Sequence, residues 1–411
     1  IKRSIKIVGS GGNYDIVITE IGGTVGDIES LPYIESVRQM RWELGPQNCV
    51  VIHLTLVPFL HASGELKTKP TQHSVKMLLE EGIQPDVLVL RTEHPLTEDL
   101  RKKVALFCNV EPGAVVESID VSTIYEVPLM MQKEMLDLTV LRKLGLSAGE
   151  EPSLSEWKEF LQKLKHPAHR VKIALVGKYV ELADAYKSIS ESFIHAGAAN
   201  ETAVEVTMIH SEEITEANFK TMLEGYDGIV VAPGFGSRGI EGKILTVQYA
   251  RTNDIPFLGI CLGMQCAVIE FARNVLGIEG AHSTEINPKA KHPVIDLMEE
   301  QKSITEKGGT MRLGSYKCEL LHGSEAWKCY RKEEISERHR HRYEFNNKYL
   351  ADFRNAGMIA CGTNPESGLV EIIEIPSHRW FVGVQFHPEY SSTVIKPHPL
   401  FVGFVRACIR K

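Results

Sequence analysis

The stretch at residues 256–265, PFLGICLGMQ, constrains the fold of this chain more than any other. It places Cys261 between Gly259 and Gly263 at the end of an apolar run, which is typical of a strand that turns sharply into a helix and tolerates almost no neighbouring side chains. Such a turn exposes the sulfur above the sheet, and the start of the helix favours the thiolate that attacks carbonyl carbon. A cysteine on an apolar strand is more often a small core residue, so a nucleophile needs partners elsewhere.

A second apolar strand, at residues 380–389, delivers a histidine, a proline and a glutamate. His387 can take the thiol proton, and Glu389 can fix the ring tautomer and stabilise the imidazolium. Together with the cysteine turn, this segment resembles the class I glutamine amidotransferases, whose triad forms a glutamyl thioester and releases ammonia. The resemblance implies Cys261, His387 and Glu389 as the catalytic residues.

Residues 227–239 form another apolar strand, which opens into a glycine-rich loop. A plain strand-to-helix turn is the simpler interpretation. In the functional interpretation, the backbone N–H groups of Gly234 and Leu262 point at the developing oxyanion, where one donor contributes about 3 kcal/mol. Many relatives have Pro-Gly-Gly-Phe-Gly here, whereas this chain has Ala-Pro-Gly-Phe-Gly; Pro233 has no N–H, so the donor must be Gly234.

Composition limits the remaining possibilities. At 411 residues with 43% hydrophobic side chains, the chain is long enough for two domains. It has no apolar run of membrane-span length and no signal-like start, so we expect a cytoplasmic protein without a membrane partner. Its eight cysteines lack metal-site spacing, and its net charge of −7 argues against a nucleic-acid partner.

The first half of the chain alternates predicted strands with helical patterns, which indicates a doubly wound parallel sheet. Residues 14–20 are predicted to form a buried parallel strand that ends at Glu20, and further strands are predicted at residues 49–56, 86–91, 104–108 and 114–119. Ligands gather at the carboxyl ends of such strands. Glu20, Asp27 and Glu29 therefore lie where a magnesium nucleotide would be held, although a solvated acidic turn remains the alternative.

The loop at residues 64–74 suits a triphosphate, because it offers charge and hydrogen-bond donors just before a helix. Its candidate residues are Lys67, Thr68, Lys69, Thr71 and Gln72. A solvated polar loop is the alternative on composition alone.

Three segments make the resemblance more specific. Residues 20–32, 67–74 and 105–110 resemble the synthetase domain of the CTP synthase family, and the likeness runs the whole length of the chain. It implies an α/β fold with two doubly wound parallel-sheet domains. The first is a truncated P-loop-type synthetase (amidoligase) domain over residues 1–145, a linker covers residues 146–170, and a class I glutamine amidotransferase domain covers residues 171–411.

The resemblance also implies ligand contacts, residue by residue. The nucleotide contacts are Glu20 for magnesium; Asp27, Ile28, Glu29, Lys67, Thr68, Lys69, Pro70, Thr71, Gln72 and Lys103 for UTP or CTP; and Ile119, Asp120 and Val121 for ATP. The glutamine contacts are Gly234, Leu262, Gly263, Met264, Gln265, Glu285 and Arg342. An α-amino acid needs one partner of each sign, which Glu285 and Arg342 supply. Without the resemblance, the arginine and histidine run at residues 338–344 would be interpreted as a solvated face.

The implied reaction is the ATP-dependent amination of UTP to CTP with ammonia from L-glutamine, with Mg²⁺ as cofactor. The resemblance further implies CTP as a feedback inhibitor, GTP as an allosteric activator and a homotetramer. Family members begin with a strand and a phosphate-binding loop that precede the first residue printed here. We therefore expect glutamate release from this chain, with little CTP formed by the chain alone.

Two alternatives remain at this point. An amidotransferase with another acceptor, such as a GMP synthase, would need a pyrophosphatase loop of the Ser-Gly-Gly-Val-Asp-Ser type, which the sequence lacks. A non-catalytic fragment that binds CTP or forms filaments is favoured by the missing phosphate loop and opposed by the intact triad.

Overall fold

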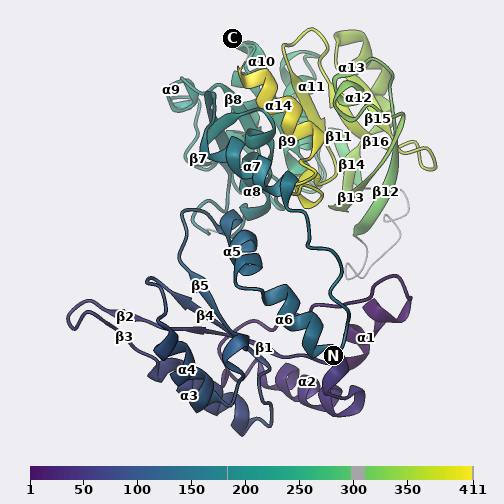
Figure 1. Cartoon of the computed structure of the whole chain (residues 1–411). Coiled ribbons are helices and arrows are strands. Elements are labelled where there is room, and N and C mark those ends of the chain that lie inside the picture. The colour runs from purple at the N-terminus through teal and green to yellow at the C-terminus, as the bar shows by residue number, and fades with distance from the viewer. Residues whose placement is uncertain (183, 298–310, 410–411) are drawn as a thin grey trace. The chain divides into compact units, whose positions relative to one another are not determined.

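The computed structural model describes residues 1–182, 184–297 and 311–409. The chain divides into two compact units, Ile1–Leu154 and Ser155–Lys411, hereafter the first and second units (Figure 1). The predicted linker at residues 146–170 spans this division, and its second half contains α7 (Ser155–Lys165), which packs on α8 (Lys187–Ala199) of the second unit. No helix in the described ranges is both long and apolar enough to cross a lipid bilayer.

A three-stranded parallel sheet forms the centre of the first unit. Its order is β1 (Ile52–Leu56), β4 (Val87–Thr92), β5 (Val115–Ile119), and the central strand β4 is buried along most of its length. The strands predicted at residues 49–56, 86–91 and 114–119 are thus confirmed. The other elements are α1 (Lys2–Ser10), α2 (Leu31–Leu44), η1 (Pro46–Asn48), β2 (Phe59–Leu60), β3 (Glu65–Leu66), α3 (Lys69–Glu80), α4 (Glu98–Cys108), η2 (Pro112–Ala114), η3 (Ile124–Glu126), α5 (Val127–Lys133) and α6 (Leu136–Lys143).

The strand predicted at residues 14–20 is wrong. This segment is exposed and belongs to no strand, and Ile18 is 91% exposed. A strand exists only through hydrogen bonds to a neighbouring strand, and no strand in the described part of the chain pairs with these residues. The apolar sequence of the segment therefore does not by itself produce a strand, and Glu20 lies in an extended exposed segment instead of at a strand end.

The strand predicted at residues 104–108 is also wrong, because these residues form the last turns of α4. Thr97 caps this helix by accepting a hydrogen bond from the Leu100 backbone N–H at 3.3 Å. Acidic residues occupy the first turn, where the helix dipole favours them, and Asn109 ends the helix in a left-handed conformation. Val104, Ala105 and Cys108 are buried on one face of the helix, whereas Leu106 and Phe107 are exposed. The short apolar run did not by itself distinguish a helix from a strand.

The second unit is built on a nine-stranded sheet in the order β13-β12-β15-β16-β17-β9-β8-β6-β7. The five strands from β17 to β7 are parallel, as predicted, and the other four extend the sheet in antiparallel fashion. The bounds are β6 (His169–Gly177), β7 (Thr202–His210), β8 (Gly228–Val231), β9 (Phe257–Ile260), β12 (Arg312–Leu320), β13 (Glu334–His341), β15 (Ile359–Thr363), β16 (Val370–Glu374) and β17 (Phe381–Val384). A small sheet consists of β10 (Ala281–Ser283), β11 (His292–Leu297) and β14 (Tyr343–Phe345).

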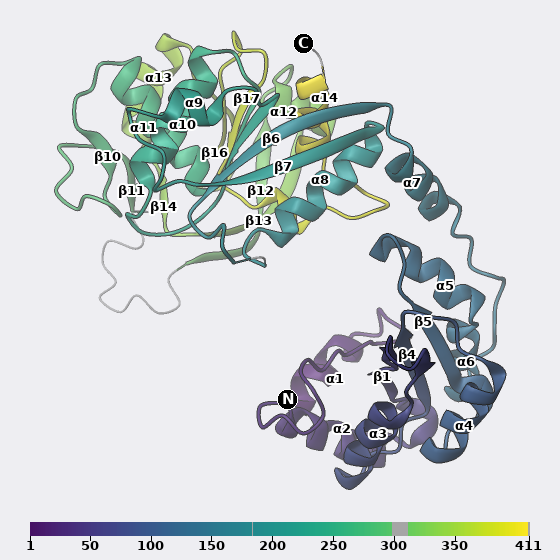
Figure 2. The same ribbon diagram turned by 90° about the vertical axis from the view of Figure 1, so that its left-hand side faces the viewer.

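Helices cover both faces of the parallel half of this sheet. Along β6, Ile173 and Leu175 belong to one buried cluster and Ala174 and Val176 to the other, because successive side chains point to opposite faces. Figure 2 shows α8 running alongside β7. The helices of the unit other than α7 and α8 are α9 (Phe219–Leu223), α10 (Ile240–Thr252), α11 (Leu262–Asn274), α12 (Glu325–Tyr330), α13 (Leu350–Ala356) and α14 (Pro399–Ile409), with short turns η5 (Asn347–Tyr349) and η6 (Pro388–Tyr390).

The N-cap of α4 can be tested by substitution of Thr97, the residue that caps this helix. Thr97→Ala should lower the free energy of unfolding of the first unit by about 1 kcal/mol, because it removes the oxygen that accepts from the Leu100 N–H. Urea denaturation followed by circular dichroism measures the change. Thr97→Ser keeps an acceptor and should stay close to wild type, and an equal loss in both variants would contradict the cap.

Candidate active site

Cys261 lies at the turn between β9 and α11, where it is the N-cap residue of the helix. Its φ of 52° and ψ of −102° are strained for a residue other than glycine, a conformation that costs on the order of 1–3 kcal/mol. A Cβ on Gly263 would lie 2.1 Å from the carbonyl oxygen of Val231, and a Cβ on Gly259 would lie 2.8 Å from the carbonyl carbon of Gly263. Both glycines are therefore required by the close packing of this turn against the sheet.

Pairing between β9 and β17 brings the histidine segment to the cysteine. The two strands are parallel, and the Cys261 N–H donates to the Val384 carbonyl at 2.7 Å. His387 Nδ1 and Glu389 Oε1 are 2.8 Å apart, and both side chains are buried. Gln385 Nε2 donates to the Cys261 sulfur at 3.6 Å. The structure thus brings the three predicted triad residues together at the carboxyl ends of parallel strands.

The environment of His387 favours its protonated form. Burial alone would lower the pKa of His387, but the Cys261 sulfur and the Glu389 carboxylate together outweigh burial and raise this pKa to about 11. Nε2 makes no hydrogen bond of standard geometry in the described part of the chain, so its contact with the sulfur is looser than the Glu389 contact. Catalytic hydrogen bonds are often long before substrate binds.

A small cavity of about 20 Å³ opens beside the sulfur. It is lined by Gly234, Phe235, Cys261, Gln265, Glu285, His341, Arg342 and Tyr343. A carboxylate and a guanidinium therefore border the same space as the thiol, which is the charge pattern that an α-amino acid requires. The volume is close to that of one water molecule, so glutamine requires movement of the lining side chains.

The remaining predicted glutamine contacts lie in the first turn of α11. Leu262, Gly263 and Met264 are buried and do not line the cavity. Gln265 does line it, and its Nε2 donates to the Tyr343 carbonyl at 3.0 Å. The Glu285 carboxylate accepts from the Gly236 N–H at 2.8 Å, which connects it to the glycine-rich loop.

The proposed oxyanion donors, Gly234 and Leu262, are neighbours in the fold. A Cβ on Gly234 would lie 3.6 Å from Leu262 Cδ2 and 3.0 Å from Lys178 Cε. Two lysines that the sequence analysis missed hold this loop: Lys178 donates to the Gly236 carbonyl at 3.5 Å and Lys243 to the Ala232 carbonyl at 2.6 Å. Burial lowers the pKa of Lys243 to about 8. The position of Lys243 within the largely apolar helix α10 was the sequence feature that could have predicted a buried lysine.

A set of charged and polar side chains beside the triad was also missed. This buried ionic network consists of Arg312, His339, His341, Glu344 and Glu371. Arg312 lies 3.3 Å from Glu344 and 2.7 Å from Glu371, and His339 Nδ1 lies 2.8 Å from His341 Nε2. His341 also lines the small cavity. The network therefore extends from β12 and β16 to the candidate glutamine site.

Burial leaves this network with little net charge. It lowers the pKa of His339 to about 2 and of His341 to about 3, so both rings are neutral near pH 7. It raises the pKa of Glu371 to about 7, against the opposing effect of Arg312, and raises the pKa of Glu344 well above its usual range. Arg312 can therefore be buried beside two carboxyl groups because protonation adjusts their charge.

The run at residues 338–344 is not the solvated face that composition alone suggested. Along β13, exposed and buried residues alternate, so Arg338 and Arg340 face outward while His339 and His341 face inward. Arginine and histidine alternate along this run, and such alternation is typical of a half-buried strand. Arg312 begins β12 and pairs with His341 of β13.

In the first unit, the predicted triphosphate residues surround the start of α3. Thr68 is its N-cap residue and accepts from Gln72 Nε2 at 3.2 Å, and Thr71 Oγ1 lies 3.1 Å from Thr55 Oγ1 of β1. Lys67 pairs with Glu65 at 2.5 Å. Lys69 and Pro70 are exposed at the first turn, where a helix favours anions.

The other predicted nucleotide residues lie at separate places in this unit. Residues 119–121 include the last residue of β5, and Asp120 pairs with Arg91 at 3.0 Å. Asp27 accepts from the Thr24 N–H at 2.7 Å, Ile28 is 82% exposed, and Glu29 is exposed. Lys103 is exposed on α4. Among the described residues, no hydrogen bond or ion pair joins them to the start of α3.

Glu20, the predicted magnesium ligand, is exposed and extended. No group of three or more His, Cys, Asp and Glu side chains in the described ranges could hold a metal ion. Mg²⁺ is commonly bound by one or two carboxylates together with water and substrate phosphates. A single carboxylate such as Glu20 fits that pattern when a nucleotide supplies the other oxygen ligands.

Comparison with known proteins relates both units to one family. The chain matches a family model described as CTP synthase N-terminus over residues 1–146 and one described as glutamine amidotransferase class-I over residues 181–407. A protein named CTP synthase from Cytophaga hutchinsonii is 65% identical over 407 residues, which cover 99% of this chain and 76% of that protein. Another from Porphyromonas gingivalis (strain W83) is 61% identical over 411 residues, with 100% and 76% covered.

A solved structure resembles the second unit. It is described as the Trypanosoma brucei CTPS glutaminase domain with bound acivicin; it is 39% identical, has a TM-score of 0.55, and covers 59% of this chain and 94% of its own. The predicted fold class, including a class I glutamine amidotransferase domain, is confirmed. The chain spans about three quarters of the length of the Cytophaga and Porphyromonas relatives.

The contact between His387 and Glu389 can be tested through the pKa of the histidine. Glu389→Gln should lower this pKa, because it removes a hydrogen bond and an electrostatic attraction that both raise it. The ring should then lose its proton at a lower pH than in the wild type. NMR titration of the histidine ring measures the shift. Glu366→Gln, which changes an exposed carboxylate, is the control, and an unchanged titration of His387 in Glu389→Gln would contradict the pairing.

Proposed function

The chain belongs to the CTP synthase family, and on this premise we propose how its residues divide the work of a glutamine-hydrolysing ligase of pyrimidine biosynthesis. The family's reaction aminates UTP to CTP, with ATP as co-substrate and ammonia from glutamine. The observation that carries the assignment is the meeting of Cys261, His387 and Glu389 at one edge of the sheet, in a chain that also matches the synthetase family model.

In the glutaminase half, we propose that the Cys261 sulfur attacks the side-chain amide carbon of glutamine. The C–S bond forms as the carbonyl electron pair moves to oxygen, where the N–H groups of Gly234 and Leu262 stabilise the negative charge. His387 gives its proton to the amide nitrogen, so the C–N bond breaks, ammonia leaves and a glutamyl thioester remains. Water then attacks the thioester carbon as His387 takes its proton, the C–S bond breaks, and glutamate leaves while the Cys261 thiolate is restored.

Glutamine recognition rests on opposite charges beside the thiol. Glu285 binds the α-amino group of glutamine in this proposal, and Arg342 binds its α-carboxylate. The first turn of α11, with Leu262, Gly263 and Met264, positions the backbone around the reacting carbon. Gln265 lines the same cavity.

In the synthetase half, ATP phosphorylates O4 of the uracil ring of UTP, and ammonia then displaces this phosphate to give CTP. We assign the UTP or CTP phosphates to residues 67–72 and Lys103, the cytosine end of bound CTP to residues 27–29, and ATP to residues 119–121. Support comes from the helix N-terminus and the two lysines at the start of α3. Glu20 would hold Mg²⁺, which supplies charge neutralisation at the nucleotide phosphates.

Regulation and assembly follow from family membership and remain part of this proposal. We assign CTP the role of feedback inhibitor and GTP the role of allosteric activator. We also propose a homotetramer.

The nucleophile assignment is tested by a glutaminase assay. Cys261→Ala should reduce glutamate release to background, because it removes the sulfur that forms the thioester. Cys266→Ala is the matched control: Cys266 lies on the same helix, and burial raises the pKa of its thiol to about 12, so it should keep most activity. Persistent activity in Cys261→Ala would refute the nucleophile, and inactivity of the wild type would favour a CTP-binding fragment.

The phosphate assignment is tested by nucleotide binding. Lys69→Gln should weaken UTP binding about tenfold, because it removes a charge at the first turn of α3. Lys76→Gln removes an exposed charge later on the same helix and should leave the affinity unchanged. Isothermal titration calorimetry measures both affinities, and an equal effect of the two substitutions would contradict a local phosphate site.

A further inference from the structure

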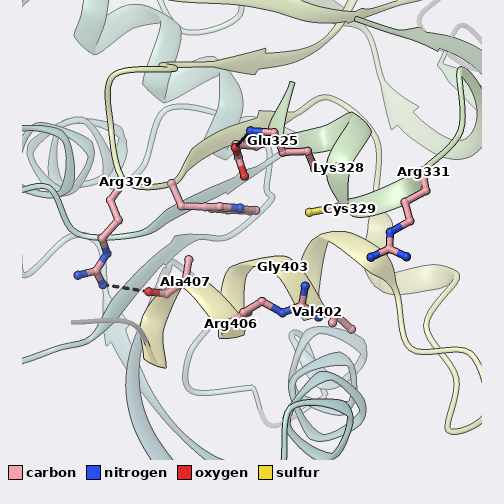
Figure 3. Close-up of a pocket in the computed structure, with 10 residues that line it drawn as sticks. Glu325, Lys328, Cys329, Arg331, Arg379, Val402, Gly403, Arg406 and Ala407 are labelled. Atoms are coloured by element: carbon pink, nitrogen blue, oxygen red, sulfur yellow. Dashed lines mark hydrogen bonds and ion pairs between the residues drawn. The ribbon is translucent and has the colours of Figure 1, made fainter. Parts of the chain in front are cut away.

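A second cavity, of about 430 Å³, lies in the second unit apart from the candidate active site (Figure 3). Its lining comes from α12, from α14 and from Arg379 and Trp380, which immediately precede β17. The catalytic His387 follows the other end of this strand. The two cavities are therefore at opposite ends of β17, and they share no lining residue.

The lining is strongly cationic. Lys328, Arg331, Arg379 and Arg406 border the cavity, and Glu325 is the only carboxylate among its lining residues. Glu325 pairs with Lys328 at 2.5 Å. The remaining positive charges of the lining are the guanidinium groups of Arg331, Arg379 and Arg406, although the chain as a whole has a net charge of −7.

The three arginines are not neutralised by other parts of the described structure. Arg379 donates to the Ala407 carbonyl at 3.1 Å, and no ion pair with a carboxylate is present for Arg331, Arg379 or Arg406 within the described ranges. In the view of Figure 3, Arg379 and Arg331 lie on either side of the cavity, with Arg406 of α14 between them. Like charges around one space repel each other, and a bound anion would remove that repulsion.

Close packing gives the cavity a partly apolar wall. A Cβ on Gly403 would lie 2.3 Å from Cys329 Sγ and 3.8 Å from Trp380 Nε1, so glycine lets α14 approach both residues. Trp380 is buried, and Val402 and Ala407 add apolar surface. Burial raises the pKa of Cys329 to about 12, so this thiol stays neutral and does not offset the arginines.

We propose that this cavity binds a small molecule that carries at least two phosphate groups, held by Arg331, Arg379 and Arg406. Guanidinium groups bind phosphate oxygens through paired hydrogen bonds, and three unneutralised arginines match an anion of more than one charge. The volume lies in the range of small-molecule sites, and the apolar part of the wall can pack against the non-phosphate part of the ligand. The net negative charge of the chain disfavours a longer nucleic acid.

Titration calorimetry with inorganic tripolyphosphate tests the site. The chain used carries Lys67→Gln and Lys69→Gln, so that the proposed UTP loop does not contribute. Adding Arg331→Gln and Arg406→Gln should weaken tripolyphosphate binding at least about tenfold, because each arginine supplies charge-assisted hydrogen bonds. Retained glutaminase activity in this variant checks that the second unit is folded.

The matched control adds Lys348→Gln and Arg354→Gln, which remove two exposed positive charges away from the cavity and should leave the affinity unchanged. Absence of tripolyphosphate binding, or an equal loss of affinity in the cavity and control variants, would overturn the proposal. Tighter, arginine-dependent binding of a single-stranded oligonucleotide than of tripolyphosphate would also overturn it, in favour of a nucleic-acid surface.

Discussion

The parallel pairing of β9 with β17 is the interaction on which the candidate active site depends. Each strand is short and apolar, and each is followed closely by a residue with a reactive side chain. Cys261 comes directly after β9, and His387 comes three residues after β17. Backbone hydrogen bonds hold the strands in one register, so two segments more than a hundred residues apart end at the same edge. The strained turn at Cys261 is tolerated because Gly259 and Gly263 allow the backbone to pack closely around it.

The second unit places unusual amounts of charge inside its core beside this edge. Arg312, His339, His341 and Glu371 come from strands of the antiparallel half, and Glu344 comes from β14 of the small sheet. Burial keeps the histidines neutral and favours protonated carboxyl groups. The parallel half of the sheet thus carries the predicted triad, and the antiparallel half carries most of the buried polar network beside it. Lys178 and Lys243 perform a related task on the other side, where they hold the glycine-rich loop through its carbonyl groups.

Charge of one sign also gathers away from the candidate active site. At the amino end of β17, Arg331, Arg379 and Arg406 border a cavity without balancing carboxylates, in a chain that is negative overall. Arg379 and Trp380 line this cavity and immediately precede β17, so a ligand there would contact residues that adjoin the strand leading to His387.

The sequence by itself determined the local chemistry: the cysteine turn, the His-Pro-Glu segment, the strands of the first unit's sheet and the parallel half of the second. These features depend on neighbouring residues, such as the glycines around Cys261, or on short apolar runs bounded by turns. Tertiary structure decided the rest. Residues 14–20 form no strand because a strand requires a partner, and residues 104–108 are helical because Val104, Ala105 and Cys108 pack into the core of the first unit from one face of α4. The buried network around Arg312 and the cationic cavity arise only when distant segments meet, since burial and electrostatic balance belong to the folded arrangement and not to any single stretch of sequence.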